Sequence, residues 1–140
     1  ATKFVAEFIG SPSMNLLSFD GVAANGAREV LLHDIKIEVP EVLEGAKGKL
    51  TFGVRPEHVY LDDAAPYRGR VTATEYLGTT QIVLLDTPNG VVKSRVASSD
   101  VVKVGQTTGL SFDARTVTVF DEQSGKALLS HANKGVLAHG

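Results

Sequence analysis

The sequence predicts an all-β protein whose short antiparallel strands close into small barrels or pack as a sandwich. Two observations support this fold class. Apolar and polar residues alternate with a period of two in several stretches, which is the pattern of a strand with one buried face. Gly, Pro, Asn and Asp residues separate these stretches at short intervals, where turns are expected. Helix is therefore expected only as a minor component.

One short helix is predicted near the start of the chain. Apolar residues recur at helical spacing over residues 4–9, Thr2 can cap the N-terminus, and Gly10 and Pro12 end the segment. A helix of about two turns is not stable alone in water, so its apolar stripe needs a surface to cover it. We expect that surface to belong to this domain or to one that is missing from the chain.

The first group of strands is predicted within residues 13–61. Strands are expected at residues 14–19, 28–32, 35–39 and 50–54, with a loop at 21–26, a break at 33–34 and a turn at 41–49. In the last of these strands, Leu50, Phe52 and Val54 are expected to form the buried face.

A corner is predicted where this last strand ends, at residues 53–58. Pro56 cannot donate to a strand ladder, and it holds Arg55 in an extended conformation. A proline followed by Glu57 suits the start of a helical turn, because proline is tolerated there and a carboxylate is favoured at the positive end of the dipole. We expect one short turn and then a new chain direction.

The second group of strands is predicted within residues 67–130, beyond a polar boundary at residues 62–66. Strands are expected at residues 68–76, 81–86, 91–97, 108–114 and 115–121, with a turn at 121–125. Residues 88–90, Pro-Asn-Gly, predict a hairpin. Gly78 is expected to provide a bulge or bend that lets a small barrel close. Residues 131–140 are expected to be a polar tail.

Composition disfavours several classes of protein. The apolar runs are far shorter than the roughly 18 residues that a membrane span needs, and no secretory signal is visible. The absence of Cys excludes disulfides and thiolate metal sites. A formal net charge of −2 argues against a nucleic-acid-binding protein, whose affinity depends on a basic face. Because the chain begins with Ala1, we expect it to be part of a longer protein.

No reactive cluster is evident. The four histidines have no partner at zinc-binding spacing, and the pair Asp62 and Asp63 is typical of a solvated loop. No nucleophile elbow and no Walker A loop are present, and residues 45–49 are expected to be a flexible turn despite their glycines and lysines. We expect no catalytic, cofactor-binding or metal-binding residue. The histidines are His33, His58, His131 and His139.

One group of basic residues has two interpretations. Arg68 and Arg70 share a face of one predicted strand, and Lys93 and Arg95 share a face of another. Binding of single-stranded nucleic acid would need aromatic platforms between them, and aromatic residues make up only 6% of the chain. A solvated outer face is favoured, while binding of an anionic ligand or an acidic partner stays open.

Four stretches, taken in order, are similar to one known family. They are F-V-A-E-F-I-G-S-P with M-N-L-L at residues 4–17, G-V-R-P-E-H at 53–58, E-Y-L-G at 75–78 followed by Gln81, and F-D with G-K-A-L at 120–128. They resemble motifs of the C-terminal regulatory domain in ATP-binding subunits of maltose-type ABC sugar importers, a domain of the TOBE (transport-associated OB) class. Ser124 replaces a threonine that is usual in the last motif. The motif residues beyond the first stretch are Gly53, Arg55, Pro56, Glu57, His58, Glu75, Leu77, Gly78, Phe120, Asp121 and Gly125.

The resemblance implies OB-like barrels joined to a preceding ATPase domain, with residues 1–12 as the junction helix between them. It implies that two copies of the subunit pair as a homodimer through these domains, and that some members also bind a regulatory protein. ATP and Mg²⁺ would belong to the preceding domain, so this chain itself is not expected to be an enzyme. The parent subunit is expected to be a transport ATPase for sugars or related solutes. It would bind the transporter membrane subunits at the cytoplasmic face of the inner membrane.

Two alternatives come from other functional classes. A TOBE barrel that senses an oxyanion or a small ligand predicts a pocket lined by main-chain N–H groups and basic side chains. An OB-fold nucleic-acid binder predicts salt-dependent binding to single strands.

Overall fold

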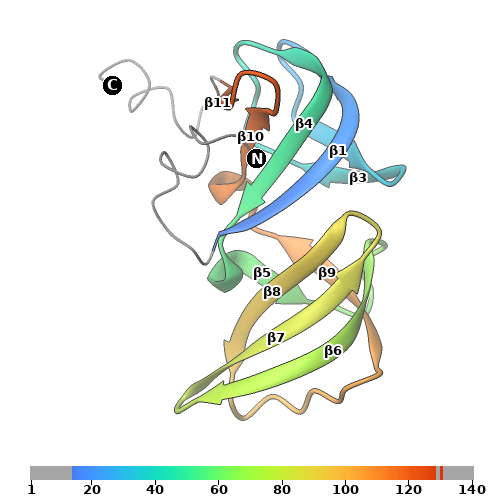
Figure 1. The fold of residues 1–140 in the computed structure, drawn as a ribbon, viewed down its shortest axis with the longest axis vertical. Coiled ribbons are helices and arrows are strands. Elements are labelled where there is room, and N and C mark those ends of the chain that lie inside the picture. The colour runs from blue at the N-terminus through green and yellow to red at the C-terminus, as the bar shows by residue number, and fades with distance from the viewer. Residues whose placement is uncertain (1–13, 129, 131–140) are drawn as a thin grey trace.

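The computed structural model describes residues 14–128 and 130 (Figure 1). Within this part of the chain, the regular structure is antiparallel β-sheet with two single 3₁₀ turns, which confirms the predicted all-β class. The predicted junction helix at residues 1–12 and the predicted tail at 131–140 lie outside the described residues. No helix in the described part is long and apolar enough to span a membrane.

Eleven strands and two turns follow one another along the described chain. They are β1 (Asn15–Ala23), β2 (Glu29–Leu32), β3 (Ile35–Glu38), β4 (Ala46–Val54), η1 (Pro56–His58), β5 (Val59–Leu61), β6 (Arg68–Leu77), β7 (Thr80–Thr87), β8 (Gly90–Ala97), β9 (Thr107–Phe112), η2 (Ala114–Thr116), β10 (Thr118–Asp121) and β11 (Lys126–Ala127).

The strands form two lobes (Figure 1). The first lobe holds the four-stranded sheet β1-β4-β10-β11 and the hairpin β2-β3. The second lobe holds the five-stranded sheet β5-β9-β6-β7-β8. Figure 1 shows the first lobe at the top of the view and the second at the bottom.

The pairing differs from the predicted division into strand groups at 13–61 and 67–130. β5 pairs with β9 in the second lobe, whereas β10 returns to the first lobe and pairs with β4. The polar stretch at residues 62–66 is a turn inside the second lobe, where the Asp62 N–H donates to the Gly109 carbonyl at 2.9 Å. Alternation identifies a strand but not its partner, so the sequence could not locate the two places where the chain crosses between lobes.

β4 is longer and more buried than its pattern predicts. It begins at Ala46. The turn expected over residues 41–49 and the flexible turn expected at residues 45–49 are therefore both wrong over residues 46–49, where the chain pairs with β1. All residues from Leu50 to Val54 are buried, rather than alternate ones. The reason is that β4 lies between β1 and β10, and Phe120 of β10 covers the face that Thr51 and Gly53 present.

Local sequence sets two of the hairpin turns, and β1 runs further than predicted. β1 continues to Ala23, through part of the loop that was predicted at 21–26. His33 and Asp34 form the two-residue turn between β2 and β3 with positive φ angles of 49° and 64°, as the twist of a tight hairpin requires. The predicted hairpin at residues 88–90 joins β7 to β8.

Gly78 lies in the turn between β6 and β7, with a φ of 80°, and does not supply the predicted bulge. The register shift of this sheet lies instead between Val71 and Ala73. A bulge depends on pairing across strands, which a single glycine does not report.

The larger of two apolar clusters in the described residues extends through both lobes, and a smaller one forms around Phe120. The ring of Phe112 in β9 lies 5.1 Å from Phe52 of the first lobe, edge to face, and 6.0 Å from Tyr67 of the second. Burial of one such aromatic side chain contributes about 1.5–3 kcal/mol, so these rings favour a fixed arrangement of the lobes. The largest fully buried side chains are Tyr67, Phe52, Phe120, Leu17, Leu32, Leu50, Leu85, Leu110, Gln81, Val42 and Val54.

Candidate functional site

The corner at residues 53–58 is the point where the chain first crosses between lobes. Arg55 is extended, with φ −78° and ψ 150°, and Pro56 opens the 3₁₀ turn η1. The His58 N–H donates to the Arg55 carbonyl at 3.0 Å. Pro56 is buried while Glu57 is exposed. The corner predicted from the sequence is confirmed as a strand end, a single turn and a new strand.

The second crossing, at η2, is bonded directly to the first. The Asp113 N–H donates to the His58 carbonyl at 3.0 Å. Asp113 in turn caps η2 by accepting from the Arg115 N–H, and its carboxylate pairs with the Arg115 guanidinium at 3.2 Å. The hydrogen bond from Arg115 holds the pKa of the Asp113 carboxyl below its usual value. The two crossings therefore support each other.

Gly53 and Phe120, from two different sequence motifs, meet in the first lobe. A Cβ on Gly53 would lie 2.9 Å from Cε2 of Phe120 and 3.3 Å from the Thr118 carbonyl oxygen. The absence of a side chain at Gly53 is what allows the buried Phe120 ring to lie over this position while β10 pairs with β4. Asp121 and Gly125 close the following turn, with the Gly125 N–H donating to the Asp121 carbonyl at 2.7 Å.

The motif residues Glu75, Leu77 and Gly78 lie elsewhere, at the tip of the β6–β7 hairpin of the second lobe. All three are exposed. The buried residue of this stretch is Gln81, whose Nε2 donates to the carbonyls of Ala97 and Asp100 at 3.1 and 2.7 Å. The corner motif and the closing motif thus lie in the first lobe and at the crossings. The motif at residues 75–78 lies away from both.

Polar contacts between the lobes were not predicted from the sequence. The Asn15 side chain makes two bonds to the Lys93 main chain, donating to its carbonyl and accepting from its N–H, both at 2.8 Å. Asn89 Nδ2 donates to the Ser18 carbonyl at 3.1 Å. In the sequence, Asn15 belongs to a motif that indicates only the family resemblance, and Asn89 is predicted only to lie in a hairpin turn. Nothing in the local pattern indicates a partner some 70 positions away.

Tyr67 supports the Asn89 contact from the core of the second lobe. Its hydroxyl donates to Asn89 Oδ1 at 2.7 Å and lies 3.1 Å from Thr87 Oγ1. Burial raises the pKa of the Tyr67 hydroxyl, against the opposing effect of these hydrogen bonds. The resulting chain from Tyr67 through Asn89 to Ser18 joins the two lobes with hydrogen bonds.

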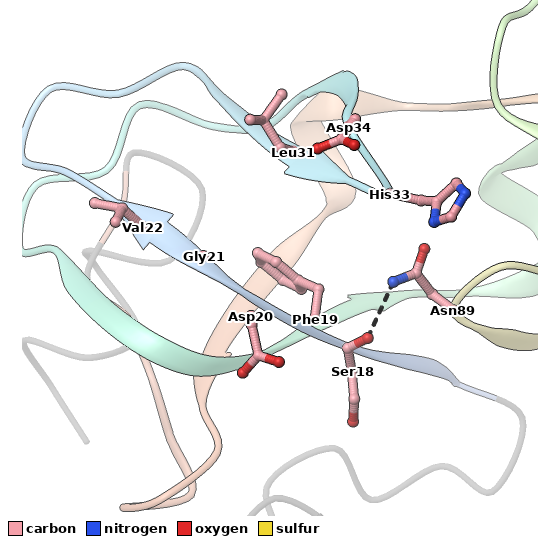
Figure 2. Close-up of a pocket in the computed structure, with 9 residues that line it drawn as sticks. All are labelled: Ser18, Phe19, Asp20, Gly21, Val22, Leu31, His33, Asp34 and Asn89. Carbon is pink, nitrogen blue, oxygen red and sulfur yellow. Dashed lines mark hydrogen bonds between the residues drawn. The ribbon is translucent and has the colours of Figure 1, made fainter.

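A groove of about 590 Å³ begins at this chain of hydrogen bonds (Figure 2). It lies between β1 and the β2–β3 hairpin. Figure 2 shows Val22 at one end and His33 with Asn89 at the other, with Asp20 on the β1 side and Asp34 and Leu31 on the hairpin side. No Lys or Arg lines it, so the groove is acidic in character. Its lining residues are Ser18, Phe19, Asp20, Gly21, Val22, Leu31, His33, Asp34 and Asn89.

The other residues considered for chemistry are dispersed. Among the described residues, no group of three or more His, Asp or Glu could hold a metal ion. His33 lies in the groove and His58 in the corner, while His131 and His139 are outside the described residues. The predicted solvated loop at residues 62–63 is a bonded turn, in which Asp63 accepts from Thr108 Oγ1 at 2.9 Å.

The four basic residues lie on an outer face of the second lobe. Arg68, Arg70, Lys93 and Arg95 are all exposed. Arg70 is directly opposite Asp86, so the face carries charges of both signs. This arrangement is the mixed, solvated face that the sequence favoured.

Two family models match the sequence in tandem. A model described as the MalK OB fold domain matches residues 10–59, and one described as the TOBE domain matches residues 52–120. The two matches meet at the corner.

Curated relatives extend well beyond this chain. It is 33% identical over 128 residues to the sn-glycerol-3-phosphate import ATP-binding protein UgpC of Pectobacterium atrosepticum, covering 89% of this chain and 36% of the relative. It is 36% identical over 137 residues to the protein of the same name from a Ruegeria species, covering 90% of this chain and 35% of the relative. The chain therefore spans about a third of the length of these relatives.

The fold is similar to that of a protein of known structure. The cytoplasmic molybdate-binding protein ModG, in a crystal form with molybdate bound, superposes with a TM-score of 0.59 over 75% of this chain and 94% of that one. The two sequences are 19% identical, so the likeness concerns the fold alone.

Proposed function

We infer that this chain, which belongs to the MalK OB-fold and TOBE domain families, is the non-catalytic regulatory and dimerisation domain of an ABC importer ATP-binding subunit. The observation that carries the inference is the tandem match of both family models over residues 10–120, with relatives that are named as importer ATP-binding proteins. These relatives are named for sn-glycerol 3-phosphate. We accordingly propose that the solute of the parent transporter belongs to the sugars, polyols and their phosphates.

The geometry of the two crossings fits a domain that acts as a rigid support. An ATPase domain that opens and closes needs a partner domain that keeps its shape during each cycle. The bond from the Asp113 N–H to the His58 carbonyl, the Asn15 contacts to Lys93, and a core shared through Phe112 all oppose motion of one lobe against the other. We propose that the motif residues of the corner and of the closing turn serve this shape rather than any chemistry.

The partners follow from the family and are proposals for this chain. They are the ATPase domain of the same subunit, a second copy of the subunit, and, through the parent protein, the transporter membrane subunits at the cytoplasmic face of the inner membrane. ATP and Mg²⁺ would be bound by the ATPase domain. A regulatory protein is a further proposed partner.

A chimera tests this proposal. The part of the Pectobacterium relative that this chain matches, 36% of its length, is replaced by this chain, and the transporter is reconstituted in proteoliposomes. We expect ATP-dependent uptake of labelled glycerol 3-phosphate, whereas a subunit that lacks the matched part should assemble poorly and lose uptake. Hydrolysis of ATP by this chain alone would contradict the proposal, and so would uptake that is unaffected by deletion of the domain.

The structure gives less support to the oxyanion-sensing alternative. The likeness to the molybdate-binding protein concerns the fold. The groove between β1 and the β2–β3 hairpin is lined by Asp20 and Asp34 and by no basic side chain, whereas an oxyanion site needs N–H donors and positive charge.

A further inference from the structure

The sheet β1-β4-β10-β11 has buried residues on both of its faces. Residues directly opposite each other on paired strands point to the same face. Phe52 of β4 is opposite Leu17 and Val119, and all three belong to the main apolar core. Thr51, the next residue of β4, is opposite Phe120 and therefore points to the other face, which we call the outer face. The outer face is formed by Leu16, Thr51, Gly53, Thr118, Phe120 and Ala127.

The outer face is buried at its centre although the main core lies on the opposite side of the sheet. Phe120 is 0% exposed and Thr51 is 2% exposed. Within the described chain, the apolar residues packed against Phe120 are Met14 and Ala127, and the main contacts of β10 are with β4 and β11, its neighbours in the sheet. A ring that lies on a sheet hides one side against the strands, but its other side stays exposed unless a further layer covers it. The burial of Phe120 therefore indicates a covering segment on the outer face.

Met14 shows which end of the chain reaches this face. It immediately precedes β1 and packs against Phe120. The segment before it, residues 1–13, therefore joins the described chain beside the outer face. Met14 is five positions after Ile9, and five extended residues reach about 17 Å. This reach is long enough for residues 4–9 to lie over Phe120.

The segment before Met14 has the apolar side chains that such a cover needs. Its apolar residues recur at helical spacing and share one side of the segment, whereas Lys3 and Glu7 fall on the other side. An apolar stripe of this kind is stable only against a matching surface. The residues of the stripe are Phe4, Val5, Phe8 and Ile9.

The other end of the chain fits the outer face less well. Ser130 forms a bridge with Val42, which belongs to the main core and not to the cluster around Phe120. Residues 131–140 contain two large apolar residues, Val136 and Leu137, and no Phe or Tyr. The N-terminal segment is thus the better occupant both by position and by composition.

We propose that the outer face binds residues 4–9 of this same chain, with the rings of Phe4 and Phe8 over Phe120 and with Met14 in the same cluster. The segment that leads into the domain is then fixed to the first lobe. Under the proposed function, this contact would hold a preceding ATPase domain in one direction relative to the lobe. That consequence rests on the proposed function, whereas the contact itself does not, so its failure would leave the regulatory role unaffected.

Ring-to-ring NOEs in the full chain test the contact directly. The chain is prepared with protonated Phe and Met methyl groups in a deuterated background, so that Met14, the only methionine, gives a single methyl signal. We expect NOEs from the Phe120 ring and from the Met14 methyl group to the rings of Phe4 and Phe8. Phe4→Leu and Phe8→Leu should each remove the signals of the substituted ring, which assigns them.

Urea denaturation measures what the contact contributes to stability. Phe8→Ala should lower the urea midpoint, whereas the matched control Glu7→Ala, on the other side of the segment, should leave it unchanged. In the Phe120→Leu background, the effect of Phe8→Ala should shrink to less than half, because the ring that Phe8 covers is gone. Deletion of residues 131–140 should leave the NMR signals of Met14 and Phe120 unchanged.

Four results would overturn the proposal. They are an absence of NOEs from Phe120 to Phe4 and Phe8, equal effects of Phe8→Ala and Glu7→Ala, a change in the Phe120 signals when residues 131–140 are deleted, and NOEs that arise only between chains. The last is detected in a mixture of labelled and unlabelled chains, and it would assign the cover to a second copy. If Phe120→Leu fails to fold, the NOEs of the unmodified chain still decide between these results.

Discussion

Gly53 is the residue at which the packing between β4 and β10 leaves no room for a side chain. Gly53→Ala would place a Cβ 2.9 Å from Phe120 Cε2 and 3.3 Å from the Thr118 carbonyl oxygen. The buried ring or the strand must move, so we expect the free energy of unfolding to fall by about 1–3 kcal/mol. Urea denaturation followed by circular dichroism measures the change.

Gly21→Ala is the matched control for this prediction. Gly21 lies on the neighbouring strand β1, and a Cβ there would meet only the Phe19 ring, at 3.4 Å. We expect a much smaller loss of stability. If both substitutions cost the same, the contact with Phe120 is not what requires a glycine at Gly53.

Tyr67 makes the stability of the chain depend on pH in the alkaline range. Burial raises the pKa of its hydroxyl in the folded state above that in the unfolded state. The stability that this shift contributes is therefore fully present below about pH 10, the value for an unfolded tyrosine, and is lost as the pH rises through the folded pKa. We expect the free energy of unfolding to fall more steeply above that pH than it does in Tyr67→Phe.

The same variant has a cost at neutral pH. Tyr67→Phe removes the donor to Asn89 Oδ1, so we expect it to be about 0.5–1.5 kcal/mol less stable than the unmodified chain. The difference between the two proteins should shrink as the pH rises. A difference that is constant over the alkaline range would show that the Tyr67 hydroxyl is not the titrating group.

At the scale of elements, Asn15 at the start of β1 is the main polar connection to β8. Asn15→Ala leaves the Lys93 N–H and carbonyl without their side-chain partner. We expect a loss of about 1–3 kcal/mol in the free energy of unfolding, measured by urea denaturation. Asn25→Ala is the control, because Asn25 accepts one exposed bond from the Gly45 N–H, and its loss should be well below that of Asn15→Ala. Equal losses would contradict a connecting role for Asn15.

The strands themselves could be predicted because their signal is local. Alternation and turn residues located the hairpin at residues 88–90 and the corner at Pro56 without any knowledge of the partners. The second buried face of β4 could not be predicted, since it depends on Phe120, which comes from a strand more than 60 positions later. The same holds for the bond between Asp113 and His58.

The groove was beyond sequence reasoning for a related reason. Val22 and Leu31 are residue types that are common in any strand. They line the groove because β1 and the β2–β3 hairpin lie across from each other, and a sequence pattern does not record which strands come to lie across from each other.

At the scale of the whole molecule, the described chain has two lobes, and its main apolar core extends through both of them. It crosses between the lobes twice, and each crossing is bonded to the other. Contacts between Phe52, Phe112 and Tyr67 run across the same boundary. We therefore expect the lobes to fold as a single cooperative unit, as a support for a moving ATPase domain would require.

Equilibrium urea unfolding, followed by NMR through separate amide signals in each lobe, tests this claim most directly. The signals of Leu50 and Phe52 report on the first lobe, and those of Val83 and Leu85 report on the second. We expect all four signals to disappear at one urea concentration, with the same dependence on denaturant. Loss of one lobe while the other stays folded would contradict the account, because the crossings would then not hold the two lobes together.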